Sequence, residues 1–134
     1  AKKVVETVWQ QLYGTYGLRS LSPEDEAYHG KYVGKLHDRD AAYHQGTVWA
    51  FPMGGFITAF VKVNNYSKES IEMAKKLMAP VADHLMDGCI GSVAEIFDGD
   101  DPHVSRGCYA QAWSVGEMLR AYVEDILEKE KEFV

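Results

Sequence analysis

The chain has 134 residues, of which 46% are hydrophobic and 25% are charged, and its formal net charge is -6. This composition predicts one globular domain with a core of its own and excludes a disordered chain. An acidic chain lacks the basic surface that nucleic-acid binding requires, and anionic membranes repel it. We therefore expect neither a nucleic acid nor a membrane as a partner.

The beginning of the sequence and its cysteines bear on the compartment. The first residues lead directly into an amphipathic pattern rather than a signal peptide. No apolar run reaches the roughly 18 residues that a membrane-spanning helix needs. Cys89 and Cys108 fit neither a disulfide framework nor a zinc-site spacing. We expect a soluble, cytoplasmic protein with free thiols.

Apolar residues recur at helical spacing in four segments, which predicts an all-α fold. The expected helices cover residues 4–12, 47–63, 67–85 and 109–127. Ser67 is expected to cap the third helix, and Gly54 with Gly55 should let a neighbouring helix approach the second closely. No segment shows a convincing strand pattern.

Two long segments without periodicity, residues 16–45 and 87–108, separate the predicted helices. Both exceed the roughly 2 to 8 residues that usually connect two helices, and such segments often carry function in compact domains. If each helix pair is an antiparallel hairpin, the two segments emerge at the same end of the fold. The sequence therefore predicts helical hairpins with long functional loops at one end.

Polar and aromatic side chains crowd together in residues 43–49, Tyr-His-Gln-Gly-Thr-Val-Trp. Flat apolar faces and hydrogen-bonding groups at this spacing suit a sugar, which presents both C–H faces and hydroxyls. The alternative is a structural segment in which Thr47 caps the second helix and Trp49 anchors it in the core. The heptapeptide alone leaves both interpretations open.

Glu95 is the candidate for chemistry in the second long segment. Its apolar neighbours can hold the backbone while the carboxylate points into a cleft, where it can act as a general base that activates water. The alternative is an ordinary carboxylate of an acidic surface loop. Asp98, in the same loop, can instead fix its own loop through local hydrogen bonds.

Patterns for cofactors are absent from the sequence. The acidic residues 98–101 lack the alternating ligands of a calcium loop, and the five histidines form no i, i+4 pair for a catalytic zinc. Neither cysteine is tied to a histidine by pattern, and no Gly-rich phosphate loop follows a strand. We expect no metal and no organic cofactor.

Four motifs, in the same order along the chain, resemble the C-terminal end of glycogen debranching enzymes. They are Gly-Leu-Arg-Ser-Leu-Ser-Pro at 17–23, Arg-Asp-Ala-Ala-Tyr-His-Gln-Gly-Thr-Val-Trp at 39–49, Ala-Glu-Ile-Phe-Asp-Gly at 94–99 and Gln-Ala-Trp-Ser at 111–114. The resemblance is to the amylo-α-1,6-glucosidase domain and covers nearly the whole chain apart from its charged tail. It implies an (α/α)6 toroid whose loops at one end surround the substrate.

The resemblance also implies a reaction, hydrolysis of the α-1,6-linked glucose stub at a glycogen branch point with inversion. An inverting glycosidase places a general acid and a general base about 6.5 to 9.5 Å apart. By motif match Glu95 is the base, whereas the acid of the family is an Asp whose motif has no counterpart in this chain. The residues expected to shape or reach the subsite for the glucose ring are Asp40, Tyr43, His44, Gln45, Trp49, Arg19, Gln111 and Trp113. For Trp113, at the start of a predicted helix, the alternative is a structural position in the core.

The length indicates a fragment, because a toroid of six helical hairpins needs several hundred residues and this chain offers about two hairpins. Residues 1–134, which begin at Ala1 inside a helical pattern, are expected to form a single all-α segment, the C-terminal fragment of a larger glucosidase domain. The expected partners are the remainder of its parent chain and glycogen or a branched maltooligosaccharide. Unpaired apolar helix faces favour self-association. We expect little or no hydrolysis by the fragment alone.

Three alternatives to a debranching enzyme remain open. Another inverting α-glucosidase, glucoamylase-like or trehalase-like, would differ in its preference between α-1,6 and α-1,4 linkages. A non-catalytic glycan-binding helical module would bind maltooligosaccharides without depending on Glu95. A purely structural helical interaction domain would neither bind nor hydrolyse them.

Overall fold

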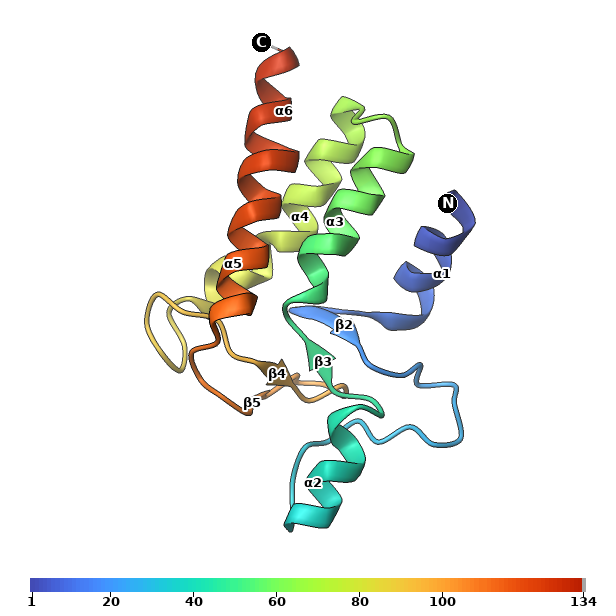
Figure 1. Cartoon of the computed structure of the whole chain (residues 1–134), viewed down its shortest axis with the longest axis vertical. Coiled ribbons are helices and arrows are strands. Elements are labelled where there is room, and N and C mark those ends of the chain that lie inside the picture. The colour runs from blue at the N-terminus through green and yellow to red at the C-terminus, as the bar shows by residue number, and fades with distance from the viewer. Residues whose placement is uncertain (134) are drawn as a thin grey trace.

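A computed structural model describes residues 1–133 of the chain (Figure 1). The main helices are α1 (Lys2–Leu12), α2 (Leu36–Tyr43), α3 (Pro52–Val63), α4 (Lys68–His84) and α5 (Ala112–Ala121). α5 continues through the π-helical segment η1 (Tyr122–Leu127), α6 (Glu128–Glu130) and the 3-10 segment η2 (Lys131–Phe133). No helix within residues 1–133 combines the length and apolarity that crossing a membrane requires.

Five short strands join the segments between the helices into one antiparallel sheet. They are β1 (Tyr13–Gly14), β2 (Gly17–Arg19), β3 (Val48–Trp49), β4 (Ile96–Phe97) and β5 (Ser105–Arg106), and they lie side by side in chain order. In the middle of the sheet, Val48 pairs with Arg19 on one side and with Phe97 on the other. The all-α prediction is therefore wrong in this respect. Strands of two or three residues are too short to show an alternating pattern, so nothing local marks them.

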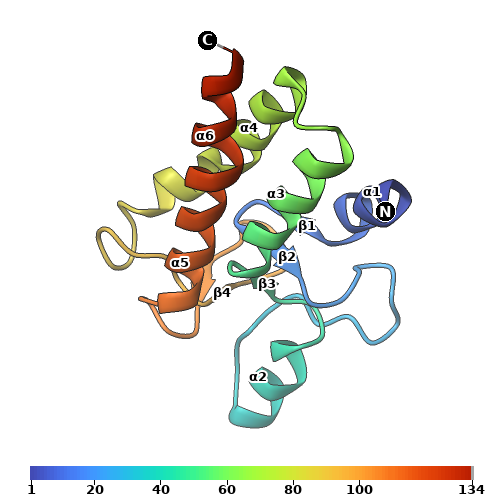
Figure 2. The same ribbon diagram turned by 45° about the horizontal axis from the view of Figure 1, so that its top comes forward.

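α3 is the centre of the helical layer, because α1, α4 and α5 all pack against it (Figure 2). Its side chains Met53 and Ile57, one helical turn apart, are fully buried. A Cβ atom at Gly54 would lie 2.6 Å from the backbone oxygen of Glu117 on α5, so the missing side chain lets the two helices approach. The predicted close approach is confirmed for Gly54 and wrong for Gly55, which faces open space.

The helix predicted to start at Thr47 begins at Pro52, and Val48 with Trp49 forms a strand instead. Thr47 therefore caps no helix: its hydroxyl donates to the carbonyl oxygen of Tyr43 at 2.7 Å. Pro52 suits the first helical position, because its φ angle is already helical and an N–H there would have no helical partner. The structural interpretation of Thr47 as an N-cap is corrected accordingly.

The other helix boundaries agree with the sequence pattern in part. Ser67 caps α4 as predicted, since its hydroxyl oxygen accepts the backbone N–H three residues later at 3.2 Å. α2 lies inside the segment 16–45, which showed no helical period, because Ala42 is its one buried residue and no apolar stripe marks it. The last helix begins at Ala112 rather than Tyr109.

Both long connections lie at the same end of the molecule, as the hairpin argument predicted. α1 and α4 run toward the sheet, whereas α3 and α5 start at the sheet and run away from it (Figure 1). α2 lies on the side of the sheet that faces away from these helices (Figures 1 and 2). The segments 13–51 and 85–111 consequently meet at the sheet, and a site built from both must lie there.

Candidate functional site

Glu95 lies immediately before β4, next to the points where β3 and β5 end. Its backbone N–H donates to the carbonyl oxygen of Cys108, just after β5, at 2.8 Å. Its carbonyl oxygen accepts the N–H of Ala50, just after β3, at 3.4 Å. The neighbours Ala94 and Ile96 are buried, whereas Glu95 is half-buried. The sheet thus holds the backbone of Glu95 and leaves its side chain accessible.

Both carboxylate oxygens of Glu95 accept a hydrogen bond from the protein. The hydroxyl of Tyr43, the last residue of α2, donates to Oε1. The backbone N–H of Cys108 donates to Oε2 at 2.9 Å. Gly107, with a φ angle of +66°, makes this approach possible, because a Cβ atom there would lie 2.5 Å from Oε2. Donors from two distant segments therefore fix the orientation of the carboxylate.

The Tyr43 hydroxyl stays protonated at neutral pH and therefore donates a hydrogen bond. Burial, the hydrogen bond to Glu95 and the negative charge of that carboxylate raise the pKa of Tyr43 from 10.0 to about 12. Each carboxylate oxygen has two lone pairs, so one hydrogen bond to each leaves capacity for a further donor such as a water molecule. The protein thus orients the Glu95 carboxylate and leaves lone pairs on both oxygens free to accept further hydrogen bonds.

Aromatic rings extend outward from Tyr43. The ring of Trp49 lies 4.6 Å from that of Tyr43, and the ring of His44 is parallel to Trp49 at 5.3 Å. Phe51 and Trp113 stack on each other at 4.3 Å, and Trp113 meets Trp49 edge-on at 6.3 Å. Trp49 is 7% exposed, and its Nε1–H donates to the carbonyl oxygen of Tyr43 at 3.0 Å. The rings therefore form a cluster of fixed orientation.

A groove of about 410 Å³ lies along this aromatic cluster, one ring away from the contact between Tyr43 and Glu95. Its lining is largely apolar, and Trp113 is 47% exposed. Flat apolar surface of this kind packs against the C–H faces of a sugar ring. The lining residues are Leu12, Leu18, Arg19, Ser20, His44, Trp49, Phe51, Pro52 and Trp113.

The structure places the remaining predicted binding residues less centrally. Arg19 lines the groove, but its guanidinium donates to two backbone carbonyl oxygens, at 2.6 and 3.0 Å. Asp40 is exposed on α2, and Gln45 is exposed between α2 and β3. Gln111 precedes α5, and its backbone N–H donates to a carbonyl oxygen at 2.9 Å. Asp40, Gln45 and Gln111 thus lie outside both the groove and the hydrogen bonds of Glu95.

Asp98 fixes its own part of the fold, in line with the role that the sequence allowed for it. It is 3% exposed, and its carboxylate accepts hydrogen bonds from Nε and Nη2 of Arg106, the shortest at 2.9 Å. It also accepts the backbone N–H of Tyr32 at 2.9 Å. The hydrogen bonds to Asp98 raise the pKa of Arg106 above its ordinary value. Asp98 therefore ties the segment before α2 to the sheet.

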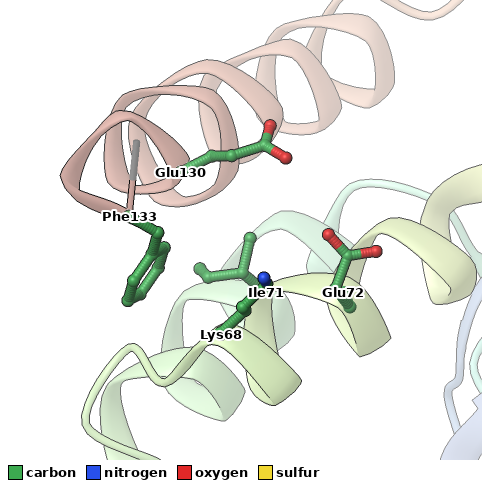
Figure 3. A pocket seen from close by; sticks show the side chains of 5 residues that line it. All are labelled: Lys68, Ile71, Glu72, Glu130 and Phe133. Carbon is green, nitrogen blue, oxygen red and sulfur yellow. The ribbon is translucent and has the colours of Figure 1, made fainter.

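Two further hollows lie away from Glu95. An apolar groove of about 620 Å³ runs between α4 and α5, with Met78, Val115 and Leu119 in its walls. A pocket of about 140 Å³ lies at the opposite end of the helices from the sheet (Figures 1 and 3). It is lined by Lys68, Ile71, Glu72, Glu130 and Phe133. Neither hollow contains a predicted site residue, and among residues 1–133 no group of three His, Cys, Asp or Glu side chains could hold a metal.

Residues 1–120 match the family model described as amylo-alpha-1,6-glucosidase. The chain belongs to the amylo-α-1,6-glucosidase family. It therefore corresponds to a C-terminal region of glycogen debranching enzymes. The family is related to glycoside hydrolases, and its name indicates a glycogen-related substrate. The match includes Tyr43, Glu95 and Trp113, and it ends at residue 120, one residue before the end of α5 at Ala121.

Sequence reasoning missed three residues of the candidate site. Phe51, the residue before α3, lines the groove and stacks on Trp113 at 4.3 Å. Its aromatic side chain, two residues after the aromatic segment 43–49, was the available signal. Gly107 contributes the space for the Glu95 carboxylate, and Cys108 contributes a backbone N–H. Because every residue type except proline carries such an N–H, no side-chain pattern could have identified Cys108.

Proposed function

We propose that this chain supplies the general base, Glu95, for hydrolysis of the α-1,6-linked glucose stub at glycogen branch points with inversion. The observation that supports this role most directly is the carboxylate of Glu95, held by donors from Tyr43 and Cys108 beside an aromatic groove. Membership of the amylo-α-1,6-glucosidase family supplies the substrate class.

In this reaction, Glu95 takes a proton from a water molecule whose oxygen attacks the anomeric carbon of the terminal glucose. The bond from that carbon to the 6-oxygen of the branched residue breaks, and a general acid donates a proton to the leaving oxygen. Attack from the face opposite the leaving group inverts the anomeric configuration. Because the acid and the base stand about 6.5 to 9.5 Å apart in such enzymes, the water fits between them.

The general acid comes from the parent chain in this proposal, since no motif for it occurs here. The four large helices support a position within a helical ring: α3 and α5 run in one direction, while α1 and α4 return in the other (Figure 1). A toroid of helical hairpins likewise contains two sets of helices that run in opposite directions. The isolated chain, with only the base, is then inactive.

The aromatic groove holds the glucose ring in this proposal. Trp113 and Phe51 offer stacked faces to its C–H groups, and His44 offers a ring nitrogen to a hydroxyl. Asp40, Gln45, Gln111 and Arg19 remain predicted sugar contacts on the resemblance alone. The exposed Trp113 indole also favours a second candidate, a glycan-binding module, which would bind maltooligosaccharides regardless of residue 95.

The test measures glucose release from a glycogen limit dextrin by the full-length enzyme that contains this segment. Glu95→Gln, shown to be folded, is expected to lose about 10²-fold or more in turnover, because removing a general base costs that much. Glu26→Gln, which removes an exposed carboxylate from the loop before α2, should keep full activity. The first glucose released should be the β-anomer, as inversion of an α-linkage requires.

Near-native turnover of the Glu95→Gln enzyme would contradict the role of Glu95. Release of α-glucose would contradict inversion. If the native enzyme releases no glucose at all, while the isolated chain and its Glu95→Gln variant bind a maltooligosaccharide equally well, the glycan-binding module replaces the hydrolase.

A further inference from the structure

Tyr43 is fixed from several directions although α2 is largely exposed. Its carbonyl oxygen accepts hydrogen bonds from the hydroxyl of Thr47 at 2.7 Å and from Nε1 of Trp49 at 3.0 Å. Its ring packs against the rings of Trp49 and Tyr32, with centroids 4.6 and 5.8 Å away. These contacts leave the phenol little freedom, and its hydroxyl is directed at Glu95.

We infer that Tyr43 is a positioning residue for the base Glu95, holding Oε1 while the backbone N–H of Cys108 holds Oε2. This inference rests on the function proposed above for Glu95. It changes the role that the sequence suggested for Tyr43, because the hydroxyl serves the carboxylate rather than a hydroxyl of the sugar.

The chemistry of a carboxylate explains what two donors achieve. A free carboxylate rotates and accepts protons from any direction, whereas one held at both oxygens presents its remaining lone pairs in a fixed direction. The high pKa of Tyr43 keeps the phenol a donor throughout, which excludes it as a competing base.

The decisive variant is Tyr43→Phe in the full-length enzyme, with Tyr32→Phe as the matched control. Tyr32 lies beside Tyr43, but within residues 1–133 its hydroxyl makes no hydrogen bond to Glu95. Tyr43→Phe should lower kcat by about 10- to 100-fold, the rate factor that corresponds to one hydrogen bond to a charged group. KM should stay close to the native value, because the phenol donates to the carboxylate of Glu95 and not to the sugar. Tyr32→Phe should leave kcat and KM unchanged.

A second measurement tests the contact without any activity. In the chain with 13C-labelled tyrosine Cζ, the signal that disappears in Tyr43→Phe should titrate at a pH of about 12. In Glu95→Gln the same signal should titrate at lower pH, because the negative charge next to the phenol is gone. A Tyr43 signal that does not respond to Glu95→Gln overturns the inference, whatever the kinetics show.

The outcomes separate this inference from the proposed function. If the native enzyme releases glucose but Tyr43→Phe raises KM and leaves kcat close to the native value, Tyr43 contacts the sugar and the inference is wrong while the hydrolase stands. If the native enzyme releases no glucose, the proposed function fails and the positioning role fails with it, even where the tyrosine titration confirms the contact.

Discussion

The helical layer and the sheet end of this molecule are held together in different ways. In the helical layer, α3 buries Met53, Ile57 and Val61 completely among its neighbours. At the sheet end, Glu95 is oriented by single hydrogen bonds from Tyr43 and Cys108, which lie 52 and 13 residues away in sequence. Apolar burial depends on area and is non-directional, whereas those hydrogen bonds depend on the position of individual atoms.

This difference predicts which changes the two regions tolerate. A small volume change in the helical layer alters stability and leaves the geometry at Glu95 intact. The same change at the sheet end displaces a functional atom while most of the fold remains. Glycines offer a sharp test, because replacement by alanine adds one methyl group at a known place.

The largest effect is expected for Gly107→Ala. A Cβ atom there would lie 2.5 Å from Oε2 of Glu95, and the carboxylate must move to avoid it. A displacement of a catalytic group by about 1 Å can cost 10²-fold in rate, so glucose release by the full-length enzyme should fall by about that factor. The comparison of initial rates at saturating limit dextrin measures it.

Gly91→Ala is the matched control for Gly107→Ala. Both glycines have positive φ angles, +79° and +66°, so alanine is strained at either position by about 1 kcal/mol. A Cβ atom at Gly91, however, meets nothing within 4 Å. Equal losses of activity in the two variants would show that backbone strain, rather than displacement of Glu95, causes the effect.

The same contrast explains how much of the fold was predictable. The helices that pack on α3 carry apolar residues at helical spacing, so the sequence located them within a few residues. α2 buries only Ala42, and the strands are two or three residues long, so neither has a period to detect. The strands become recognisable only through partners such as Val48 and Phe97, which are far apart along the chain.

Prediction of the site had the same limit, because contacts between residues far apart in the sequence leave no local pattern. Glu95 and the aromatic segment 43–49 became candidates through their residue types and the family motifs, because the sequence shows side-chain chemistry directly. The hydrogen bond that Tyr43 donates to Glu95 was not predictable, since it depends on how α2 packs at the sheet. Arg19 illustrates the reverse case, an eligible sugar contact whose donors are directed to backbone carbonyl oxygens.

Gly54→Ala and Gly55→Ala test the helical layer with two adjacent residues. Alanine at Gly54 would place a methyl group 2.6 Å from the backbone oxygen of Glu117, and such overpacking should lower the free energy of unfolding by about 1 to 3 kcal/mol. Alanine at the exposed Gly55 should raise it by about 0.5 to 1 kcal/mol, because it favours the helix.

Urea unfolding of the chain, followed by circular dichroism, measures both glycine variants of α3. Opposite signs are the expected result. Two variants with the same change in the free energy of unfolding would contradict the close packing of α3 on α5.

The smallest effect should come from His84, which joins the two regions. His84 is buried at the C-terminal end of α4, and its Nε2 accepts the backbone N–H of Ala94, the residue before Glu95, at 3.2 Å. Its surroundings are the rings of Tyr16 and Phe97 and, 3.9 Å from Nδ1, the exposed carboxylate of Asp87. Burial lowers the pKa of His84 below its ordinary value of 6.5, and the charge of Asp87 offsets this only in part.

The sign of the pH dependence follows from the lowered pKa of His84. As the pH falls below about 6.5, His84 of the unfolded chain binds a proton before His84 of the folded chain does, so the free energy of unfolding should decrease until the folded pKa is passed. His84→Gln keeps an acceptor for Ala94 but cannot titrate, and it should remove this decrease, whereas substitution of the exposed His37 by Gln should leave it in place. Urea unfolding between pH 5 and 8 measures the three proteins. An unchanged slope in His84→Gln would mean that the link between α4 and the Glu95 segment does not depend on the charge of His84.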